Sequence, residues 1–189
     1  LLGDAPQAEN MTANHDAIIA SRLAYSLDLH GPVLAVNTAC SSGLVALHQA
    51  CQSLRLGECD AAVAAGVNLM PTPFAVDTME EAGMLAPDGV CRAFDRRAGG
   101  MVPGEAVVAV VLKPFSKALR DGDPIHAVIA GSGINYDGRT QGITAPNGLA
   151  QVRLLTDVYN RCGVDAADIG YRVAHGTGTP LGDPVEVNA

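Results

Sequence analysis

The sequence predicts a layered α/β fold, and three observations indicate it. Short apolar runs rich in Val, Ala and Ile alternate with segments whose apolar residues recur at helical spacing. One of these runs, residues 106–112, is apolar throughout, as expected of a strand covered on both faces. The chain of 189 residues is also long enough to bury a sizeable core. Strands and helices that alternate in this way favour a largely buried sheet with helices packed on it.

The first part of the chain predicts two helices separated by a strand. Asn14 is placed to cap a helix that ends near Leu27. The apolar run at 33–37 predicts a strand, after which the chain turns sharply into a second helix that ends at Gly57. The buried stripe of this second helix is predicted to be Leu44, Leu47, Cys51 and Leu54. Residues 61–67 then predict another buried strand.

The rest of the chain continues the alternation. Helices are predicted at 74–85, 114–120 and 149–162, and strands at 106–112, 125–134 and 171–174. Pro87-Asp88-Gly89 has the composition of a turn, and a glycine-rich loop follows it as far as Gly104. Asp183-Pro184 predicts the start of a last helix, with Asp183 as its N-cap and the proline in its first turn.

Charge and composition argue against several classes of function. The formal net charge is −8 and no basic patch is present, which argues against a nucleic-acid partner or an anionic membrane partner. No apolar run approaches the roughly 20 residues that span a bilayer. The five cysteines include no C-x-x-C pair, and their odd number argues against a disulfide framework. We therefore expect a reducing, cytoplasmic compartment and no metal site.

Cys40 is the candidate nucleophile. It stands in Val36-Asn37-Thr38-Ala39-Cys40-Ser41-Ser42-Gly43, where a predicted strand ends and a helix begins. A thiol there faces unpaired helix N–H groups and the positive end of the helix dipole, and both stabilise a thiolate. Backbone N–H groups at such a turn can also hold a developing oxyanion. A cysteine between a strand and a helix can equally be inert, so this geometry alone leaves both interpretations open.

His175 is the second candidate. It follows a predicted strand and opens the loop His175-Gly176-Thr177-Gly178-Thr179. The glycines allow close approach of a ligand, and the threonine hydroxyls can bind an amide-bearing one. A histidine in such a place suits general-acid or hydrogen-bonding work. The alternative is a structural histidine that bonds a loop carbonyl.

Five motifs together resemble the β-ketoacyl synthase (ketosynthase) family, in order and over nearly the whole chain. They are Asn37-Thr38-Ala39-Cys40-Ser41-Ser42-Gly43-Leu44, Cys91-Arg92-Ala93-Phe94-Asp95, Gly131-Ser132-Gly133-Ile134-Asn135-Tyr136-Asp137-Gly138, His175-Gly176-Thr177-Gly178-Thr179 and Leu181-Gly182-Asp183-Pro184-Val185-Glu186. The details are most similar to ketosynthase domains of modular type I polyketide synthases. Two departures are Gly43, where such domains often carry a third serine, and Arg172-Val173, where the family usually has Val then Glu.

The resemblance implies a thiolase-like fold of five αβαβα layers. Residues 1–189 are then expected to be one partial ketosynthase domain, without a separate second domain and truncated at both ends. They would hold the later part of the first half of the fold and the start of the second.

The resemblance also implies roles for single residues. Cys40 would receive the acyl chain from an acyl carrier protein, and His175 would promote decarboxylation of a malonyl-type extender. Thr177 and Thr179 would contact the phosphopantetheine arm that carries the substrates, and the domain itself would bind no cofactor. Other polyketide synthase domains would be partners, and the domain would form a homodimer through 33–37. A second catalytic His and a further oxyanion donor would lie beyond Ala189, so the isolated chain is expected to be inactive.

Three alternatives to an elongating polyketide ketosynthase remain. A non-elongating relative would only bind and transfer acyl chains, but such forms commonly lose the His of the His-Gly-Thr loop. A fatty-acid 3-oxoacyl-carrier-protein synthase would belong to the same acyltransferase class. An unrelated cysteine hydrolase would need a His poised on Cys40, and the Gly-Thr-Gly-Thr loop has no role in that scheme.

Overall fold

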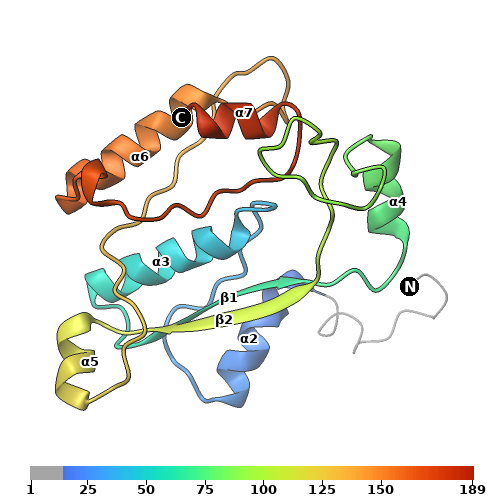
Figure 1. Cartoon of the computed structure of the whole chain (residues 1–189). Coiled ribbons are helices and arrows are strands. Elements are labelled where there is room, and N and C mark those ends of the chain that lie inside the picture. The colour runs from blue at the N-terminus through green and yellow to red at the C-terminus, as the bar shows by residue number, and fades with distance from the viewer. Residues whose placement is uncertain (1–14) are drawn as a thin grey trace, which may run out of the picture. The chain divides into compact units, whose positions relative to one another are not determined.

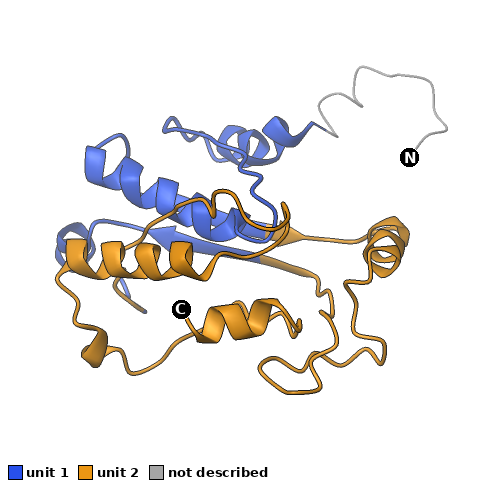
Figure 2. Cartoon of the chain, turned by 90° about the horizontal axis from the view of Figure 1, so that it is seen from above, with its two compact units in different colours: residues 1–66, 108–126 blue, residues 67–107, 127–189 orange. Residues whose placement is uncertain are grey.

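The computed structural model describes residues 15–189 (Figure 1). The elements run in the order α2 (Asp16–Ser26), α3 (Ser42–Leu56), β1 (Ala62–Asn68), α4 (Phe74–Glu81), β2 (Ala106–Leu112), α5 (Phe115–Asp121), α6 (Gly148–Cys162), a 3-10 turn (Ala166–Asp168) and α7 (Gly182–Val187). The chain divides into two compact units (Figure 2). The first comprises the chain up to residue 66 together with 108–126, and the second comprises 67–107 and 127–189.

In the first unit, the ends of α2 and α3 are set by local contacts. The imidazole Nδ1 of His15 accepts the N–H of Ala17 at 3.2 Å and caps α2, while the predicted cap Asn14 lies outside the described residues. Gly57 ends α3 in the left-handed conformation at a φ of +73°, as predicted. The predicted buried stripe of α3 is partly wrong, because Leu44 is 74% exposed and His48 is buried beside Cys51.

Strands β1 and β2 form a two-stranded sheet and confirm two predicted strands. The side-chain amide of Asn68, at the end of β1, donates to the carbonyl of Gly104 at 2.6 Å, just before β2 begins. The predicted cover on both faces of β2 is wrong for the described chain, because all its residues but Leu112 are exposed.

Three other predicted strands are absent from the structure. The segments 33–37, 125–134 and 171–174 form no named strand. A strand is defined by backbone pairing with a neighbour, and these segments find none among residues 15–189. The apolar pattern of these segments is therefore not sufficient to make a strand, because the pairing that defines one is missing among the described residues.

In the second unit, glycines and side-chain caps again set where helices begin and end. The predicted helix at 74–85 is shorter, ending at Glu81, and Gly83 follows it at a φ of +66°. The Asn147 side chain accepts the N–H groups of Leu149 and Ala150 and caps α6, which contacts α7.

Helix α7 begins at Gly182, so Asp183 lies inside its first turn and is not the predicted N-cap. Within 15–189, every helix is too short or too polar to cross a membrane.

Candidate active site

Cys40 lies exposed at a sharp turn in front of α3. The residue before it, Ala39, has a φ of +54°, a left-handed conformation that is unfavourable for a residue with a Cβ. Ser41 follows as the N-cap residue of α3, and its side chain makes no cap hydrogen bond to the helix. The thiol therefore stands next to the N-terminal end of α3, as the sequence predicted.

Side-chain hydrogen bonds hold this turn in its strained shape. The side-chain amide oxygen Oδ1 of Asn37 accepts the Ala39 N–H at 3.2 Å, and the Ser42 hydroxyl accepts the Thr38 N–H at 2.9 Å. The Ser42 hydroxyl also donates to the Ala39 carbonyl at 2.6 Å, and the Ser41 hydroxyl donates to the Thr38 carbonyl at 2.9 Å. The small polar residues around Cys40 therefore stabilise the turn by hydrogen bonds, in addition to leaving room around the thiol.

The first turn of α3 packs closely on β1. A Cβ added at Gly43 would lie 3.8 Å from the Cα of Gly66, which is ordinary van der Waals contact. A Cβ at this position therefore fits without displacing the strand. Gly43 is a tolerated departure and does not disturb the turn at Cys40.

The other cysteines have different surroundings. Cys51 is buried on α3, and Cys59 and Cys162 are partly buried. Cys91 is exposed like Cys40, but its thiol lies 3.8 Å from the carbonyl of Gly176 and belongs to the loop that contacts the histidine loop. Cys40 is the cysteine that combines exposure with a position at the start of a helix.

The loop from His175 to Thr179 is held by a carboxylate of α7. The Glu186 carboxylate accepts the N–H of His175 at 2.5 Å and the N–H of Gly176 at 2.8 Å. The His175 residue itself is exposed. The two N–H groups that open the loop are consequently occupied, so they are not available to hold a substrate oxyanion.

A second carboxylate of α7 joins this loop to another segment of the chain. Asp183 is only 3% exposed. Its Oδ1 accepts the Gly178 N–H at 3.1 Å and its Oδ2 accepts the Phe94 N–H at 2.6 Å. Both oxygens have partners, which meets the requirement that a buried charge be hydrogen-bonded.

The segment around Phe94 leaves the histidine loop little room. A Cβ at Gly178, whose φ is +72°, would lie 3.0 Å from the Gly100 carbonyl oxygen and 3.2 Å from the Cys91 sulfur. A Cβ at Gly176 would lie 3.4 Å from the Phe94 ring. The Gly100 N–H also donates to the Gly178 carbonyl at 2.9 Å. Gly178 is therefore favoured by both backbone conformation and close approach, and Gly176 is favoured by its φ of +53°.

The two threonines of the loop contact each other. Their hydroxyl oxygens lie 3.1 Å apart, and the Thr179 hydroxyl also accepts the Gly182 N–H at 3.1 Å, at the start of α7. Both residues are partly buried. Because a hydroxyl has one donor and two acceptor positions, each threonine retains capacity for a further partner.

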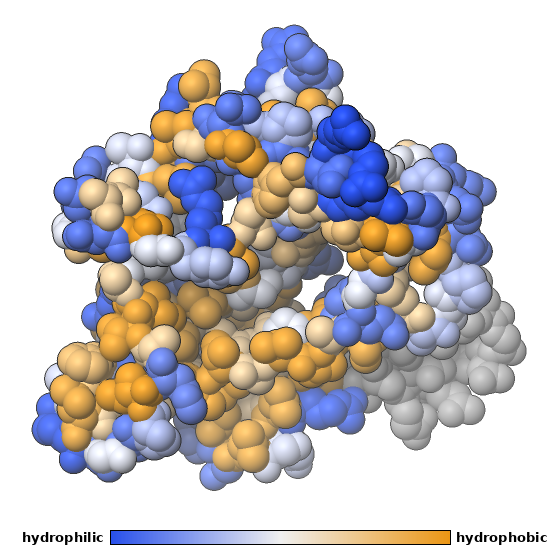
Figure 3. Space-filling view, in the orientation of Figure 1, coloured by the Kyte–Doolittle hydropathy of each residue, from blue (hydrophilic) through white to orange (hydrophobic). Residues whose placement is uncertain are grey.

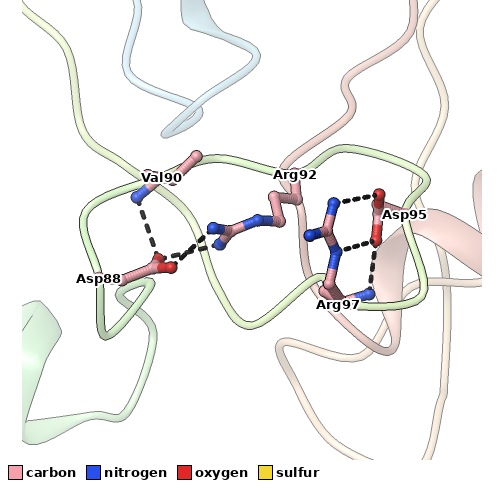
Figure 4. A network of polar contacts seen from close by, with 5 residues as sticks. All are labelled: Asp88, Val90, Arg92, Asp95 and Arg97. Atoms are coloured by element: carbon pink, nitrogen blue, oxygen red, sulfur yellow. Dashed lines mark hydrogen bonds and ion pairs between the residues drawn. The ribbon is translucent and has the colours of Figure 1, made fainter.

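Two acid–base pairs stabilise the loop that carries Phe94 (Figure 4). Arg92 contacts Asp88 at 2.7 Å and Arg97 contacts Asp95 at 3.1 Å. The hydrogen bond from the Arg97 side chain, followed by that from the Arg97 backbone, lowers the pKa of Asp95 to about 2. The hydrogen bond from Arg92 likewise lowers the pKa of Asp88. Both carboxylates therefore stay ionised at any pH near neutrality.

The structure groups only some of the predicted site residues. Cys40 lies in the first unit, whereas His175, Thr177 and Thr179 lie in the second and share one loop. The sequence interpretation assigned no role on that loop to Asp183 and Glu186. The signal that could have found them is two carboxylates three residues apart on one helix, next to a glycine-rich loop with exposed N–H groups. Among residues 15–189, no cluster of three or more His, Cys, Asp or Glu side chains could hold a metal ion.

Comparison with known proteins places these residues in a family. Residues 3–118 match the β-ketoacyl synthase N-terminal domain, and residues 126–189 match the β-ketoacyl synthase C-terminal domain. Polyketide synthase ThaG of Burkholderia thailandensis is 60% identical over 99% of this chain, which spans 3% of that protein. Polyketide synthase PksM of Bacillus subtilis is 49% identical over the whole chain, which spans 4% of it.

Solved structures agree with the sequence comparison. The ketosynthase from module 6 of the bacillaene synthase of Bacillus subtilis has a TM-score of 0.90 and 49% identity, over 92% of this chain and 31% of that one. The oxazolomycin ketosynthase domain OzmH KS7 of Streptomyces albus also has a TM-score of 0.90, with 44% identity. The fold is thus the thiolase-like layered fold of ketosynthases, and the chain spans about a third of the solved domains. The chain belongs to the β-ketoacyl synthase family.

Proposed function

We propose that this chain is part of a condensing acyltransferase of polyketide biosynthesis, which extends a Cys40-bound acyl chain by decarboxylative Claisen condensation. The observation that carries the proposal is the exposed thiol of Cys40 at the strained turn before α3. Family membership and the polyketide synthase relatives support it. The same relatives favour polyketide synthesis over fatty-acid synthesis as the pathway.

The proposed reaction has three steps. The Cys40 thiolate attacks the thioester of an acyl carrier protein, and the carrier thiol leaves, so that the chain becomes a Cys40 thioester. A malonyl-type thioester on a second carrier then loses carbon dioxide, and His175 stabilises the resulting enolate by hydrogen bonding. Finally, the enolate carbon attacks the Cys40 thioester carbonyl, the thiolate leaves, and the carrier holds a β-ketoacyl chain that is two carbons longer.

The partners follow from this reaction. Both substrates arrive on the phosphopantetheine arm of an acyl carrier protein, and we assign Thr177 and Thr179 to contact with that arm, since each hydroxyl retains hydrogen-bonding capacity. We infer that other polyketide synthase domains are partners as well, because this chain spans only 3–4% of the relatives named polyketide synthases. The odd number of cysteines supports a reducing, cytoplasmic compartment.

We also propose a homodimer through residues 33–37. These residues form no strand within the part of the chain that the structure describes, and Leu34 is 59% exposed. An apolar segment with free backbone groups suits pairing with the same segment of a second copy. Sedimentation of the complete domain checks this, and an active monomer at micromolar concentration would contradict it.

The test of function uses the complete ketosynthase domain that contains this chain. Acyl and malonyl carrier proteins are supplied, and the β-ketoacyl product is measured by mass spectrometry. We expect Cys40→Ala to abolish acylation and product, and Cys59→Ala, a matched cysteine in the same unit, to retain both. His175→Ala should retain acylation of Cys40 and lose release of carbon dioxide. Acylation that persists in Cys40→Ala, or the loss of both steps in His175→Ala, would refute these assignments.

A further inference from the structure

The hydroxyl groups of Thr177 and Thr179 lie against Gly182, the first residue of α7. A Cβ added at Gly182 would lie 2.6 Å from the Thr179 hydroxyl oxygen and 3.4 Å from the Thr177 hydroxyl oxygen. Atoms that are not bonded do not pack as closely as 2.6 Å, so a side chain at this position would displace the Thr179 hydroxyl. The pair of hydroxyls therefore has its place because residue 182 has no side chain.

The backbone of Gly182 also determines which hydrogen-bonding positions of the pair stay free. Its N–H donates to the Thr179 hydroxyl oxygen at 3.1 Å, and the two hydroxyl oxygens lie 3.1 Å apart. Whichever threonine donates, the bond between them uses one of the two O–H groups and one acceptor position. Since the Gly182 N–H uses another acceptor position, the pair presents one O–H donor and two acceptor positions to a further partner.

One donor beside free acceptor positions suits a secondary amide. The amide carbonyl accepts from the free O–H, and the amide N–H donates to a hydroxyl oxygen. The phosphopantetheine arm contains such amides. Both threonines are partly buried, so water competes less for these bonds than at an open surface. The direction of the free donor depends on where the Thr179 oxygen lies, and Gly182 determines that place.

We propose that Gly182 is a positioning residue for the phosphopantetheine arm, because it places the Thr179 hydroxyl and thereby orients the hydroxyl pair. The inference rests on the contact proposed above between the two threonines and the arm. Gly182 needs no contact with the substrate for this effect. Its substitution should weaken recognition of the arm and leave the reactivity of the Cys40 thiol unchanged.

The first experiment compares two acyl donors on the complete domain. Acetyl-pantetheine carries the amides of the arm, and S-ethyl thioacetate carries none. Mass spectrometry of the intact protein follows acylation of Cys40 by each donor. In Gly182→Ala, the second-order rate constant with acetyl-pantetheine should fall about 2- to 10-fold, as expected for the loss of one hydrogen bond. The rate constant with S-ethyl thioacetate should not change.

Two outcomes of this comparison would contradict the proposal. An equal fall with both donors would mean that Gly182→Ala merely disturbs the fold, and no fall with either donor would mean that Gly182 has no part in recognition. Gly170→Ala is the matched control, because it makes the same change in the same unit and its Cβ would meet no atom within 4 Å. Both rate constants should equal those of wild type in this control.

A double variant tests whether Gly182 acts through Thr179. Thr179→Ala removes the oxygen that a Cβ at residue 182 would meet. Adding Gly182→Ala to Thr179→Ala should therefore change the preference for acetyl-pantetheine by less than about twofold, whereas independent effects would add. If Gly182→Ala alone does not fold, the double variant should fold, since it lacks the clash. Additive effects, or a double variant that also fails to fold, would refute the proposal.

The methyl NMR signals of the two threonines test the geometry without any activity. Gly182→Ala should shift the signals of Thr177 and Thr179, and Gly170→Ala should leave them in place. A wild-type domain that reacts no faster with acetyl-pantetheine than with S-ethyl thioacetate would refute the contact between the threonines and the arm, before any variant is made. Shifted threonine signals with an unchanged preference between the donors would overturn the positioning role alone.

Discussion

The turn before α3 keeps Ala39 in a conformation that its own side chain disfavours. A left-handed backbone costs a non-glycine residue roughly 1–2 kcal/mol. Two hydrogen bonds offset that cost: the Ala39 N–H donates to the Asn37 side-chain oxygen, and the Ser42 hydroxyl donates to the Ala39 carbonyl. The strain is therefore stored beside the candidate nucleophile, in a turn that presents Cys40 at the end of a helix.

Substitution of Ala39 tests this strain directly. Ala39→Val places a β-branched side chain at a φ of +54° and should lower the free energy of unfolding by at least about 1 kcal/mol. Ala39→Gly relieves the backbone strain but raises the conformational entropy of the unfolded chain. Its free energy of unfolding should therefore stay within about 1 kcal/mol of wild type. Thermal unfolding of the complete domain at one protein concentration distinguishes the two. Equal destabilisation by both variants would contradict the strained turn.

The stability of the loop around Phe94 depends on pH through the carboxyl group of Asp95. Its pKa in the folded protein is lowered from 3.8 to about 2, chiefly by the hydrogen bond from Arg97. The hydrogen bond between Asp95 and Arg97 therefore stabilises the folded state above about pH 3.8, and this stabilisation is lost as the pH falls toward 2. In Arg97→Gln the pKa of Asp95 should rise toward its ordinary value.

Carbon NMR of the aspartate carboxyl groups measures this pKa. Between pH 5 and 3 (a window of about two units), Asp95 should titrate in Arg97→Gln and hardly at all in wild type. Arg96→Gln removes the neighbouring positive charge and serves as the control, with a small shift expected. An Asp95 pKa that does not move in Arg97→Gln would contradict the assignment of the cause.

Helix ends in this protein are local features, and α6 shows this most clearly. The Asn147 side chain accepts the first free N–H groups, at 3.1 and 3.3 Å, and donates to the Asp137 carbonyl at 2.7 Å. Gly163 closes the other end at a φ of +63°. All these contacts except that to Asp137 join residues close in sequence, so a reading of the sequence places the helix to within a residue.

Removing the cap should weaken α6. Asn147→Ala loses the bonds to two helix N–H groups and should lower the free energy of unfolding by about 0.5–2 kcal/mol. Asn160→Ala changes the same residue type on the same helix, at an exposed position in its last turn, and should have little effect or slightly stabilise. Denaturant unfolding of the complete domain compares them. Equal effects of the two changes would contradict the capping role of Asn147.

Strands behave differently from helices here. Residues 62–68 and 106–112 pair with each other and become β1 and β2. The segments 33–37, 125–134 and 171–174 were also predicted as strands, but they join no sheet within 15–189. Apolar character predicts an extended segment, but a strand exists only where another backbone lies beside it. That neighbour is a long-range property of the fold.

Apolar side chains remain exposed over much of the described chain. Figure 3 shows them at the surface over β2 and α5. They include Val108, Val110, Val111, Phe115 and Leu119, which are 40–75% exposed. The chain also spans only 31% of the solved bacillaene ketosynthase. In a complete domain, further elements are expected to cover these faces.

The isolated 189-residue chain should therefore be inactive and prone to aggregate. Exposed apolar faces and unpaired strand edges favour association. Purified residues 1–189, supplied with acyl and malonyl carriers, should give no β-ketoacyl product and should bind a hydrophobic dye strongly. The complete domain is the control and should show product with little dye binding. Robust turnover by a soluble monomer of 189 residues would contradict this expectation.

Local sequence signals were enough to predict the helices, two of the strands and the two loops that carry Cys40 and His175. Helix periodicity, glycine stops and motif spacing all act between residues near in the chain. The burial of His48 instead of Leu44 on α3 depends on tertiary packing and could not be predicted from the sequence. The tertiary structure also shows Asp183 bonded to Phe94, 89 residues away in the chain. Such contacts depend on which distant segments meet, and the spacing of residues along one segment carries no information about that.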